Sequence, residues 1–420
     1  MVPVTVRDGA MPPEAYELAF TRDGLEVTCG DLSGRRHALT TAAHLLALDD
    51  IPFVHVEDAP AFAVRGVMLD VSRDRIPTME ELLDLVDRFA ALKINHLQLY
   101  TEHTFAYAGH EDVWRGWSPM TPDEIRSLDA HCSSKGIELA ANQNCFGHLS
   151  SWLRHDRYAH VAETHGTWMF DIFERSGPFS LCPTDERSLE FVRGLLDQLL
   201  PCFTSRLVNI GCDETFDVGQ GRAKAIVERD GRAAVHARFV NQIARDVLER
   251  GGVPMFWADI ALSAPEVMDT LPPELISLAW GYEPEAPFAE WARVHEEMGR
   301  PFWVCPGTSS WRSFTGRTTE RTGNLEAAAG CRGADGFLVT DWGDVGHQQT
   351  RPIGLHGIAH GASLAWNPDA PFDASASSFV AFGDAAVGPW LEVLGDVDLP
   401  IRRIAGFPET GRLHLANASA

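Results

Sequence analysis

The feature that most constrains the fold of this chain is a series of eight short apolar segments between residues 64 and 340, most of them followed by an amphipathic stretch. Short apolar segments predict buried strands, and amphipathic stretches predict helices that cover them. The predicted strands are Val64–Leu69, His96–Tyr100, Ile137–Ala141, Leu207–Ile210, Pro254–Trp257, Leu275–Ala279, Pro301–Cys305 and Gly336–Thr340. The clearest predicted helices are Met79–Leu92, Pro122–Lys135, Glu186–Leu200, Ala234–Arg250 and Ala286–Gly299. This alternation predicts an α/β fold, a (β/α)8 TIM barrel.

A doubly wound open sheet is the alternative architecture for alternating strands and helices. That fold often carries a complete G-x-G-x-x-G motif after a strand. This chain has only the fragment Gly219-Gln220-Gly221, which we interpret as a loop. The barrel is therefore favoured.

The chain divides into three predicted parts. Residues 1–62 are expected to form a small non-catalytic α/β domain that precedes the barrel. Its predicted elements are a hairpin of Tyr16–Phe20 and Leu25–Cys29, a helix at His37–Leu48 and a strand at Phe53–Val56. Residues 63–366 are expected to form the catalytic barrel. Residues 367–420 are a C-terminal extension, in which Phe379–Leu394 is predicted to be a helix.

Composition and charge narrow the range of partners. The chain has 420 residues, of which 45% are hydrophobic and 22% charged, and its formal net charge is −24. So acidic a chain disfavours nucleic acid or an anionic membrane surface as partner, and a neutral ligand fits best. The N-terminus lacks the apolar core of a secretion signal, no stretch is apolar enough to span a membrane, and the eight cysteines include no C-x-x-C pair. We therefore expect a cytoplasmic protein with reduced thiols.

Two adjacent carboxylates, Asp213 and Glu214, follow the predicted strand Leu207–Ile210 and Gly211. Neighbouring carboxylates resist simultaneous ionisation, and an acid that keeps its proton near neutral pH suits proton transfer. The simpler explanation is a helix N-terminus, where acidic residues complement the helix dipole. The position of the pair after a barrel strand favours catalysis instead.

Further polar and aromatic residues follow the other predicted strands. In a barrel these strand ends converge on one opening, where the active sites of this fold lie. Indole rings stack on the C–H faces of a pyranose and charged side chains bind its hydroxyls, so this set predicts a sugar pocket. The candidate binding residues are Arg73, His148, Trp257, Trp280, Trp311, Trp342 and Asp344. The connection from Asn142 to Thr184 is unusually long and rich in Trp, His and Phe, which indicates function.

Simpler explanations exist for single members of this set. Arg73 is explained equally well by a structural ion pair with Asp70 or Asp74, and a lone histidine such as His148 is more often structural than catalytic. Cys212 is a conceivable nucleophile, but a small residue packed at a strand end is the better interpretation. The chain has no H-E-x-x-H and no G-x-S-x-G, so neither a metal site nor a serine hydrolase is expected.

The chain resembles glycoside hydrolase family 20, the β-N-acetylhexosaminidases, over roughly residues 12–366. The motifs that carry the resemblance are RGVMLDVSR at 65–73, GCDE at 211–214, FWAD at 256–259 and WGYE at 280–283. In that family the 2-acetamido carbonyl of the substrate attacks the anomeric carbon. An oxazolinium intermediate forms and configuration is retained, which is an exception to the usual scheme with two catalytic carboxylates.

The resemblance implies a role for each candidate except Trp311. Glu214 would protonate the leaving oxygen and then activate water, while Asp213 would orient the acetamido N–H. Arg73 would hold the sugar 3- and 4-hydroxyls, and His148 would support the acid. Trp257, Trp280 and Trp342 would form the pocket walls, and Asp344 would bind a further hydroxyl.

Three positions depart from the family pattern. Cys212 stands where the usual Gly-Gly-Asp-Glu has its second glycine. The segment from 305 to 311 lacks the tyrosine that binds the acetamido carbonyl, for which Tyr282 or a serine is a candidate substitute. Asp344 stands where the family often carries a glutamate, one methylene longer.

The expected function is an exo-acting, retaining β-N-acetylhexosaminidase that removes terminal GlcNAc or GalNAc from a neutral amino-sugar glycan, without a cofactor. Two alternatives stay open. One is a glycosidase of the same fold that acts on a different or modified amino sugar, and the other is a catalytically silent carbohydrate-binding protein. The intact acid pair favours an enzyme.

Overall fold

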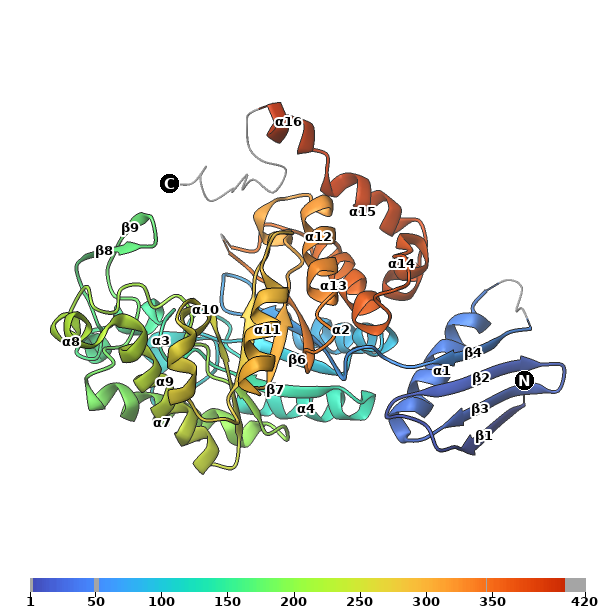
Figure 1. The fold of residues 1–420 in the computed structure, drawn as a ribbon, viewed down its shortest axis with the longest axis horizontal. Coiled ribbons are helices and arrows are strands. Elements are labelled where there is room, and N and C mark those ends of the chain that lie inside the picture. Colours follow the sequence, from blue (N-terminus) through green and yellow to red (C-terminus); the bar gives the residue numbers. More distant parts are fainter. Residues whose placement is uncertain (1–2, 49–52, 345, 405–420) are drawn as a thin grey trace.

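A computed structural model describes residues 3–48, 53–344 and 346–404, and within them eight parallel strands close into a barrel (Figure 1). The barrel strands are β5 (Val64–Asp70), β6 (His96–Tyr100), β7 (Glu138–Asn142), β10 (Leu207–Asn209), β11 (Val253–Trp257), β12 (Ile276–Trp280), β13 (Phe302–Cys305) and β14 (Gly336–Asp341). Each strand pairs with its neighbour in parallel, and β14 closes the barrel against β5 over six residue pairs. The predicted (β/α)8 barrel is confirmed.

Helices surround the barrel. The longer ones are α2 (Met79–Ala91), α4 (Pro122–Lys135), α7 (Glu186–Leu199), α9 (Arg232–Glu249), α11 (Phe288–Met298), α12 (Thr318–Ala329) and α13 (Arg351–Trp366). α4 shows why the sequence predicted its ends well. Thr121 and Glu124 form a capping box, Pro122 starts the first turn, and Gly136 ends the helix in the left-handed conformation with φ of 81°.

The apolar core has two layers. One lies between the strands and the helices, and α2 contributes Leu82, Leu85, Val86 and Phe89 to it as one buried face. The other fills the interior of the barrel and is unusually aromatic, because it includes Tyr100, Trp257, Trp303, Trp311 and Trp342. The indole rings predicted to wall a sugar pocket are therefore continuous with the core of the barrel.

The N-terminal part forms a four-stranded sheet with one helix. Its elements are β1 (Val4–Asp8), β2 (Tyr16–Thr21), β3 (Gly24–Cys29), α1 (Leu32–Leu46) and β4 (His55–Asp58), and the strand order is β1-β3-β2-β4. The predicted hairpin and the small α/β fold are confirmed, but β1 was not predicted. The helix begins five residues before the predicted His37, because Asp31 caps it by accepting a hydrogen bond from Gly34 N at 2.6 Å. The last strand begins at His55, two residues later than predicted.

The small sheet packs against the end of the barrel where the strands begin. Arg65, at the start of β5, forms an ion pair with Glu14 at 2.6 Å. Asp58 accepts hydrogen bonds from Lys93 Nζ at 3.3 Å and from Trp366 Nε1 at 2.8 Å, and both donors lie just before or after barrel elements at that same end. The small domain therefore lies on the face opposite the strand ends that were predicted to carry the site.

Three short helices follow the barrel, α14 (Ala374–Phe382), α15 (Val387–Gly395) and α16 (Leu399–Ile404). The single predicted helix Phe379–Leu394 is wrong, because Gly383, with φ of 76°, ends α14 and a second helix starts four residues later. Residues 405–420 of the predicted extension lie outside the described residues. The division into parts at 62 and 366 stays a prediction. None of the described helices is long and apolar enough to cross a membrane.

The long connection after β7 has structure of its own. It contains the short helices α5 (Ser150–Leu153) and α6 (Asp156–Ala159), followed by an antiparallel hairpin of β8 (Thr167–Phe170) and β9 (Phe173–Ser176). Figure 1 shows this hairpin projecting from the end of the molecule that lies away from the N-terminal sheet.

Candidate active site

The acid pair lies on a sharp turn directly after β10. Gly211, Cys212 and Glu214 all adopt left-handed backbone conformations, with φ of 68°, 75° and 50°. A side chain at position 211 would collide with Asn144, whose Oδ1 lies 1.8 Å from the place of a Cβ, so only glycine fits there. The turn leaves the Asp213 side chain 8% exposed and the Glu214 side chain 28% exposed. The two adjacent carboxylates therefore have different environments.

His148 joins the two carboxylates. Its Nε2 lies 3.4 Å from Asp213 Oδ2 and 3.2 Å from Glu214 Oε2. Burial by itself lowers the pKa of His148, but Asp213 and Glu214 outweigh it and raise that pKa to about 10. At neutral pH His148 is therefore protonated, and its Nε2 lies between the side chains of Asp213 and Glu214.

Asp259 is a third carboxylate beside the pair. Its Oδ2 accepts a hydrogen bond from the backbone N–H of Glu214 at 3.1 Å, which fixes the turn to the helix that follows β11. Burial and the charge of Asp213 raise the pKa of Asp259. Asp259 therefore keeps a proton at a higher pH than an ordinary aspartate, in contact with the turn that carries Asp213 and Glu214.

Arg73 lies at the centre of a second polar group on the same opening. Its guanidinium lies 2.9 Å from Asp70, 3.1 Å from Asp344 and 3.5 Å from Glu102. It also lies over the rings of Tyr100 and Trp342, at 4.9 and 5.1 Å from their centroids. Burial lowers the pKa of Arg73, but the surrounding carboxylates and Tyr100 raise it well above its usual value. The ion pair with Asp70 is thus real, yet the same guanidinium also reaches Asp344 at the mouth.

The predicted tryptophans gather around these polar groups. The rings of Trp257 and Trp342 lie 5.6 Å apart, and Trp342 donates a hydrogen bond from Nε1 to Tyr282 Oη at 2.6 Å. Tyr282 stacks on Trp280 at 5.3 Å and meets the edge of Trp311 at 5.0 Å. The structure therefore brings every predicted site residue to one opening. Trp311 is itself 3% exposed and reaches this group through Tyr282.

Several polar atoms in this group have no protein partner. Asp213 Oδ1, Trp257 Nε1 and Trp280 Nε1 are buried and form no hydrogen bond with any residue in the described part of the chain. Buried polar atoms are nearly always paired in folded proteins, so unpaired ones in one place indicate a binding site. One acceptor and two donors suit a ligand that carries both N–H and oxygen groups.

Comparison with known proteins agrees with this geometry. Residues 62–293, more than half of the chain, match the model of the glycosyl hydrolase family 20 catalytic domain. The chain belongs to glycosyl hydrolase family 20. The family predicted from the sequence motifs is therefore confirmed.

Relatives of this family 20 chain include hexosaminidase D from Homo sapiens, 27% identical over 211 residues, and from Bos taurus, 25% identical over 228 residues. These matches cover 49% and 52% of this chain, but 41% and 63% of the human and bovine proteins. The chain therefore matches less than two thirds of the length of either relative.

Solved structures share the fold. A β-N-acetylhexosaminidase crystal structure matches 91% of this chain and 92% of its own, with a TM-score of 0.71 and 18% identity. The exo β-N-acetylglucosaminidase from Vibrio harveyi in complex with N-acetylglucosamine has a TM-score of 0.69 at 16% identity, over 96% of this chain and 68% of its own. At these identities the likeness establishes the shared fold.

The structure adds one residue that the sequence prediction left out of the site. Tyr100 donates a hydrogen bond from Oη to Glu102 at 2.9 Å and accepts hydrogen bonds from Asn144 at 2.6 Å and Arg73 at 3.2 Å. It thereby links the groups that follow three neighbouring strands. Its position as the last residue of a predicted strand was the available signal, but a strand-end tyrosine is usually taken as core.

Cys212 is a packing residue. Its thiol is fully buried and donates a hydrogen bond to Ile210 O at 3.3 Å. Burial raises the pKa of this thiol well above its ordinary value, so it is not a thiolate at neutral pH. The interpretation as a small packed residue is therefore preferred over a nucleophile.

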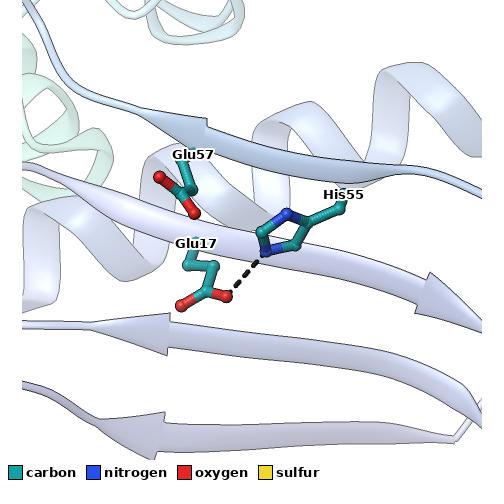
Figure 2. Close-up of side chains that lie close together, drawn as sticks. All are labelled: Glu17, His55 and Glu57. Atoms are coloured by element: carbon teal, nitrogen blue, oxygen red, sulfur yellow. Dashed lines mark hydrogen bonds and ion pairs between the residues drawn. The ribbon is translucent and has the colours of Figure 1, made fainter.

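Two groups in the described residues bring one histidine and two carboxylates within 4.8 Å of one another, close enough for a metal ion. One is His148, Asp213 and Glu214. The other is Glu17, His55 and Glu57 on the N-terminal sheet, where His55 Nε2 and Glu17 Oε1 lie 2.7 Å apart (Figure 2). Glu17 and Glu57 lie directly opposite each other on paired strands, and His55 lies beside them. This second group lies on the small domain and takes no part in the site at the barrel mouth.

Proposed function

We propose that this chain is an exo-acting, retaining β-N-acetylhexosaminidase that releases terminal GlcNAc or GalNAc by substrate-assisted catalysis. The observation that carries the proposal is the pair Asp213 and Glu214 on one imidazolium, with one buried oxygen of Asp213 left unpaired. The names of the curated relatives, hexosaminidase D and β-hexosaminidase, support the same substrate class.

The spacing of the carboxylates argues against a scheme in which both act on the sugar from opposite faces. Such pairs stand about 5 to 10 Å apart, with the substrate between them. Here the nearest oxygens of Asp213 and Glu214 lie within 4.8 Å of each other and contact the same histidine nitrogen. Both carboxylates approach from one side, so neither is placed to attack from the far face. The nucleophile is then best supplied by the substrate.

The 2-acetamido group supplies that nucleophile. Asp213 accepts the acetamido N–H through its unpaired oxygen, and the acetamido carbonyl oxygen attacks the anomeric carbon as the bond to the leaving oxygen breaks. Glu214 gives its proton to that leaving oxygen, and an oxazolinium ion forms. Water then attacks the anomeric carbon and gives its proton to Glu214, and the ring opens to restore the acetamido group with retained configuration.

The remaining residues position the sugar. Arg73 and Asp344 bind ring hydroxyls, and Trp257, Trp280 and Trp342 enclose the acetamido group and the ring. Tyr282 takes the place of the tyrosine missing after β13, because its hydroxyl lies within 2.6 Å of Trp342 Nε1 in the aromatic wall. His148 holds a proton between the two carboxylates and keeps them in position.

Hydrolysis of nitrophenyl β-glycosides of GlcNAc, GalNAc and glucose tests the proposal. We expect only the two acetamido sugars to be cleaved, with retained configuration by NMR. Asp213→Asn should lose about a hundredfold or more in kcat, and Glu214→Gln a similar factor on substrates with poor leaving groups. Thermal unfolding controls for folding of both variants.

Each other outcome favours a different function. Equal cleavage of the glucoside would remove substrate assistance. Full turnover of a substrate with a poor leaving group by Glu214→Gln would remove its role as the acid. Binding of glycans without any cleavage would favour the carbohydrate-binding alternative.

A further inference from the structure

The β8–β9 hairpin places a cluster of aromatic side chains beside the acid pair. Phe179 is the centre of this cluster, with Trp168 at 5.3 Å and Phe170 at 5.8 Å between ring centroids. Phe170 also meets Phe216, which lies two residues after Glu214, at 4.9 Å. On its other side Phe179 meets the ring of His148 edge-on at 4.8 Å. The aromatic cluster is therefore in direct contact with the residue that joins the two carboxylates.

Two arginines lie over this aromatic cluster. The guanidinium carbon of Arg175 lies 4.1 Å from the centroid of Phe170 and 5.6 Å from that of Phe179, and the guanidinium carbon of Arg232 lies 5.5 Å from that of Phe216. Both arginines are solvent-exposed. Among the residues that the structure describes, neither side chain has a hydrogen bond or an ion pair. The chain has a net charge of −24, so two arginines without an ionic partner beside the site depart from the overall negative charge.

The side of the site on which these arginines lie follows from Glu214. A general acid must contact the glycosidic oxygen. The leaving group lies beyond that oxygen, and it is therefore close to the residues that border the exposed edge of the acid. Glu214 is the more exposed member of the pair, and the aromatic cluster beneath Arg175 contacts both His148 and Phe216, which lies two residues after Glu214. The hairpin therefore borders the leaving-group side of the scissile bond.

We propose that the β8–β9 hairpin, through Arg175 with Arg232 beside it, binds a leaving-group sugar that carries an anionic substituent, a carboxylate or a sulfate ester. This inference rests on the proposed function. Aromatic faces stack on a sugar ring, and a guanidinium pairs with a carboxylate or sulfate through two parallel hydrogen bonds. Stacking on Phe170 holds the Arg175 guanidinium in place before the ligand arrives, which reduces the entropy lost on binding. The acidic surface elsewhere repels such a ligand, so discrimination depends on these two side chains.

The first test compares two disaccharides that differ only in charge. In one, β-GlcNAc is linked to a hexuronic acid, and in the other to the methyl ester of the same sugar. We expect kcat/KM to be about tenfold higher for the acid, and the ratio to fall to about one in Arg175→Gln. Arg7→Gln, the same change on an exposed arginine of the N-terminal sheet, should keep the wild-type ratio.

A second pair of substrates, with a 6-O-sulfated hexose and its unsulfated form as leaving groups, separates sulfate from carboxylate. A wild-type ratio of one or less for both pairs, or an unchanged ratio in Arg175→Gln, would overturn the proposal.

The second test does not depend on turnover. Calorimetry measures binding of the intact acid and ester disaccharides to Glu214→Gln and to the double variant Glu214→Gln/Arg175→Gln. Tighter binding of the acid by the single variant alone supports the hairpin site, even if wild type fails to cleave nitrophenyl β-GlcNAc and the proposed function is lost. Equal binding of acid and ester by the single variant overturns the hairpin site, whatever the turnover.

Discussion

At the scale of single residues, several non-glycine residues of the site lie in the left-handed backbone region. Cys212 has φ of 75°, Glu214 has φ of 50°, and His148 has φ of 56°. This conformation costs a residue with a Cβ about 1–2 kcal/mol, and such strain is commonly found at functional sites. At Glu214 and His148 the proposed role of the side chain accounts for the strained backbone. At Cys212 the side chain only packs, which explains why glycine is the usual residue there in this family.

Comparing two variants at Cys212 isolates this strain. Cys212→Gly and Cys212→Ala both remove the buried thiol, but only glycine relieves the backbone. We expect the glycine variant to be more stable than the alanine variant by about 1 kcal/mol, measured by urea unfolding. An alanine variant as stable as the glycine variant would show that the turn is unstrained at this position. Gly211→Ala is the complementary change, and it should prevent the turn from forming because of Asn144.

The charge on His148 makes stability depend on pH. Its pKa rises from 6.5 to about 10 on folding, so its stabilising contribution is complete below pH 6.5 and is lost as pH rises through about 10. The free energy of unfolding of wild type should therefore fall across this range relative to His148→Gln. Lys93, whose pKa burial lowers to about 8, titrates in the same range but is present in both proteins, so its effect cancels in the difference. Parallel curves for the two proteins would contradict the prediction.

At the scale of elements, one carboxylate of the helices after the barrel contacts two of the barrel helices. Glu392 of α15 forms an ion pair with Arg321 of α12 and lies 2.5 Å from His356 Nε2 of α13. Burial by itself raises the pKa of Glu392, but His356 and Arg321 lower it to about 2. The ion pair joins three helices that are far apart in sequence, which no local pattern could reveal.

Replacing Glu392 tests this connection. Glu392→Gln leaves Arg321, whose side chain is 4% exposed, without its ionic partner, so we expect a loss of about 1–3 kcal/mol of stability. Hydrogen exchange should rise in α15 before it rises in the barrel. Glu297→Gln, which breaks the exposed pair with Arg293, is the matched control and should cost less than about 1 kcal/mol. Equal effects of the two changes would show that Glu392 is not an anchor.

At the scale of the whole molecule, the N-terminal sheet contacts the barrel where β5 begins, whereas Arg73 follows the end of β5, so the sheet and the site lie at opposite ends of the barrel. The sheet is held by the pair Glu14 and Arg65, in which the arginine side chain is 1% exposed. Burial raises the pKa of Glu14, but His37 and Arg65 outweigh it and lower the pKa to about 2. The small domain thus stabilises the barrel without contacting the catalytic turn.

Removing the charge of Glu14 should affect stability and spare catalysis. Glu14→Gln leaves a buried guanidinium unpaired, so we expect a loss of about 3 kcal/mol at neutral pH while kcat stays as in wild type. Because the folded pKa is lowered, the contribution of Glu14 is present above pH 4.5 and is lost as pH falls through about 2. Wild type should therefore lose stability faster than the variant on acidification. Glu26→Gln, at an exposed pair with Arg7, is the control. A fall in kcat in Glu14→Gln with an intact fold would contradict this separation.

The sequence by itself determined the barrel and most of the site. Apolar strands and amphipathic helices report burial directly, and helix ends such as Thr121 and Gly136 are set by backbone chemistry within a few residues. Once the barrel is fixed, its strand ends must meet, so the positions of Asp213, Arg73 and Trp342 at one mouth followed from counting strands. Local turn chemistry also explains the errors, because the cap at Asp31 and the break at Gly383 each lie in segments of weak periodicity.

Only the tertiary structure decided how these groups act on one another. The protonation of His148 depends on two carboxylates placed within 3.4 Å by the fold of the turn, and the raised pKa of Arg73 depends on Tyr100 and on carboxylates from three strand ends. The same holds for Arg175 of β9, whose contact with Phe170 of β8 exists only because these two strands pair as a hairpin. The periodicity of apolar residues in a sequence indicates which side chains are buried, and this signal comes from many neighbouring residues together. Electrostatics and hydrogen bonding depend on distances of a few ångströms between residues far apart in the chain, and those distances exist only in the folded molecule.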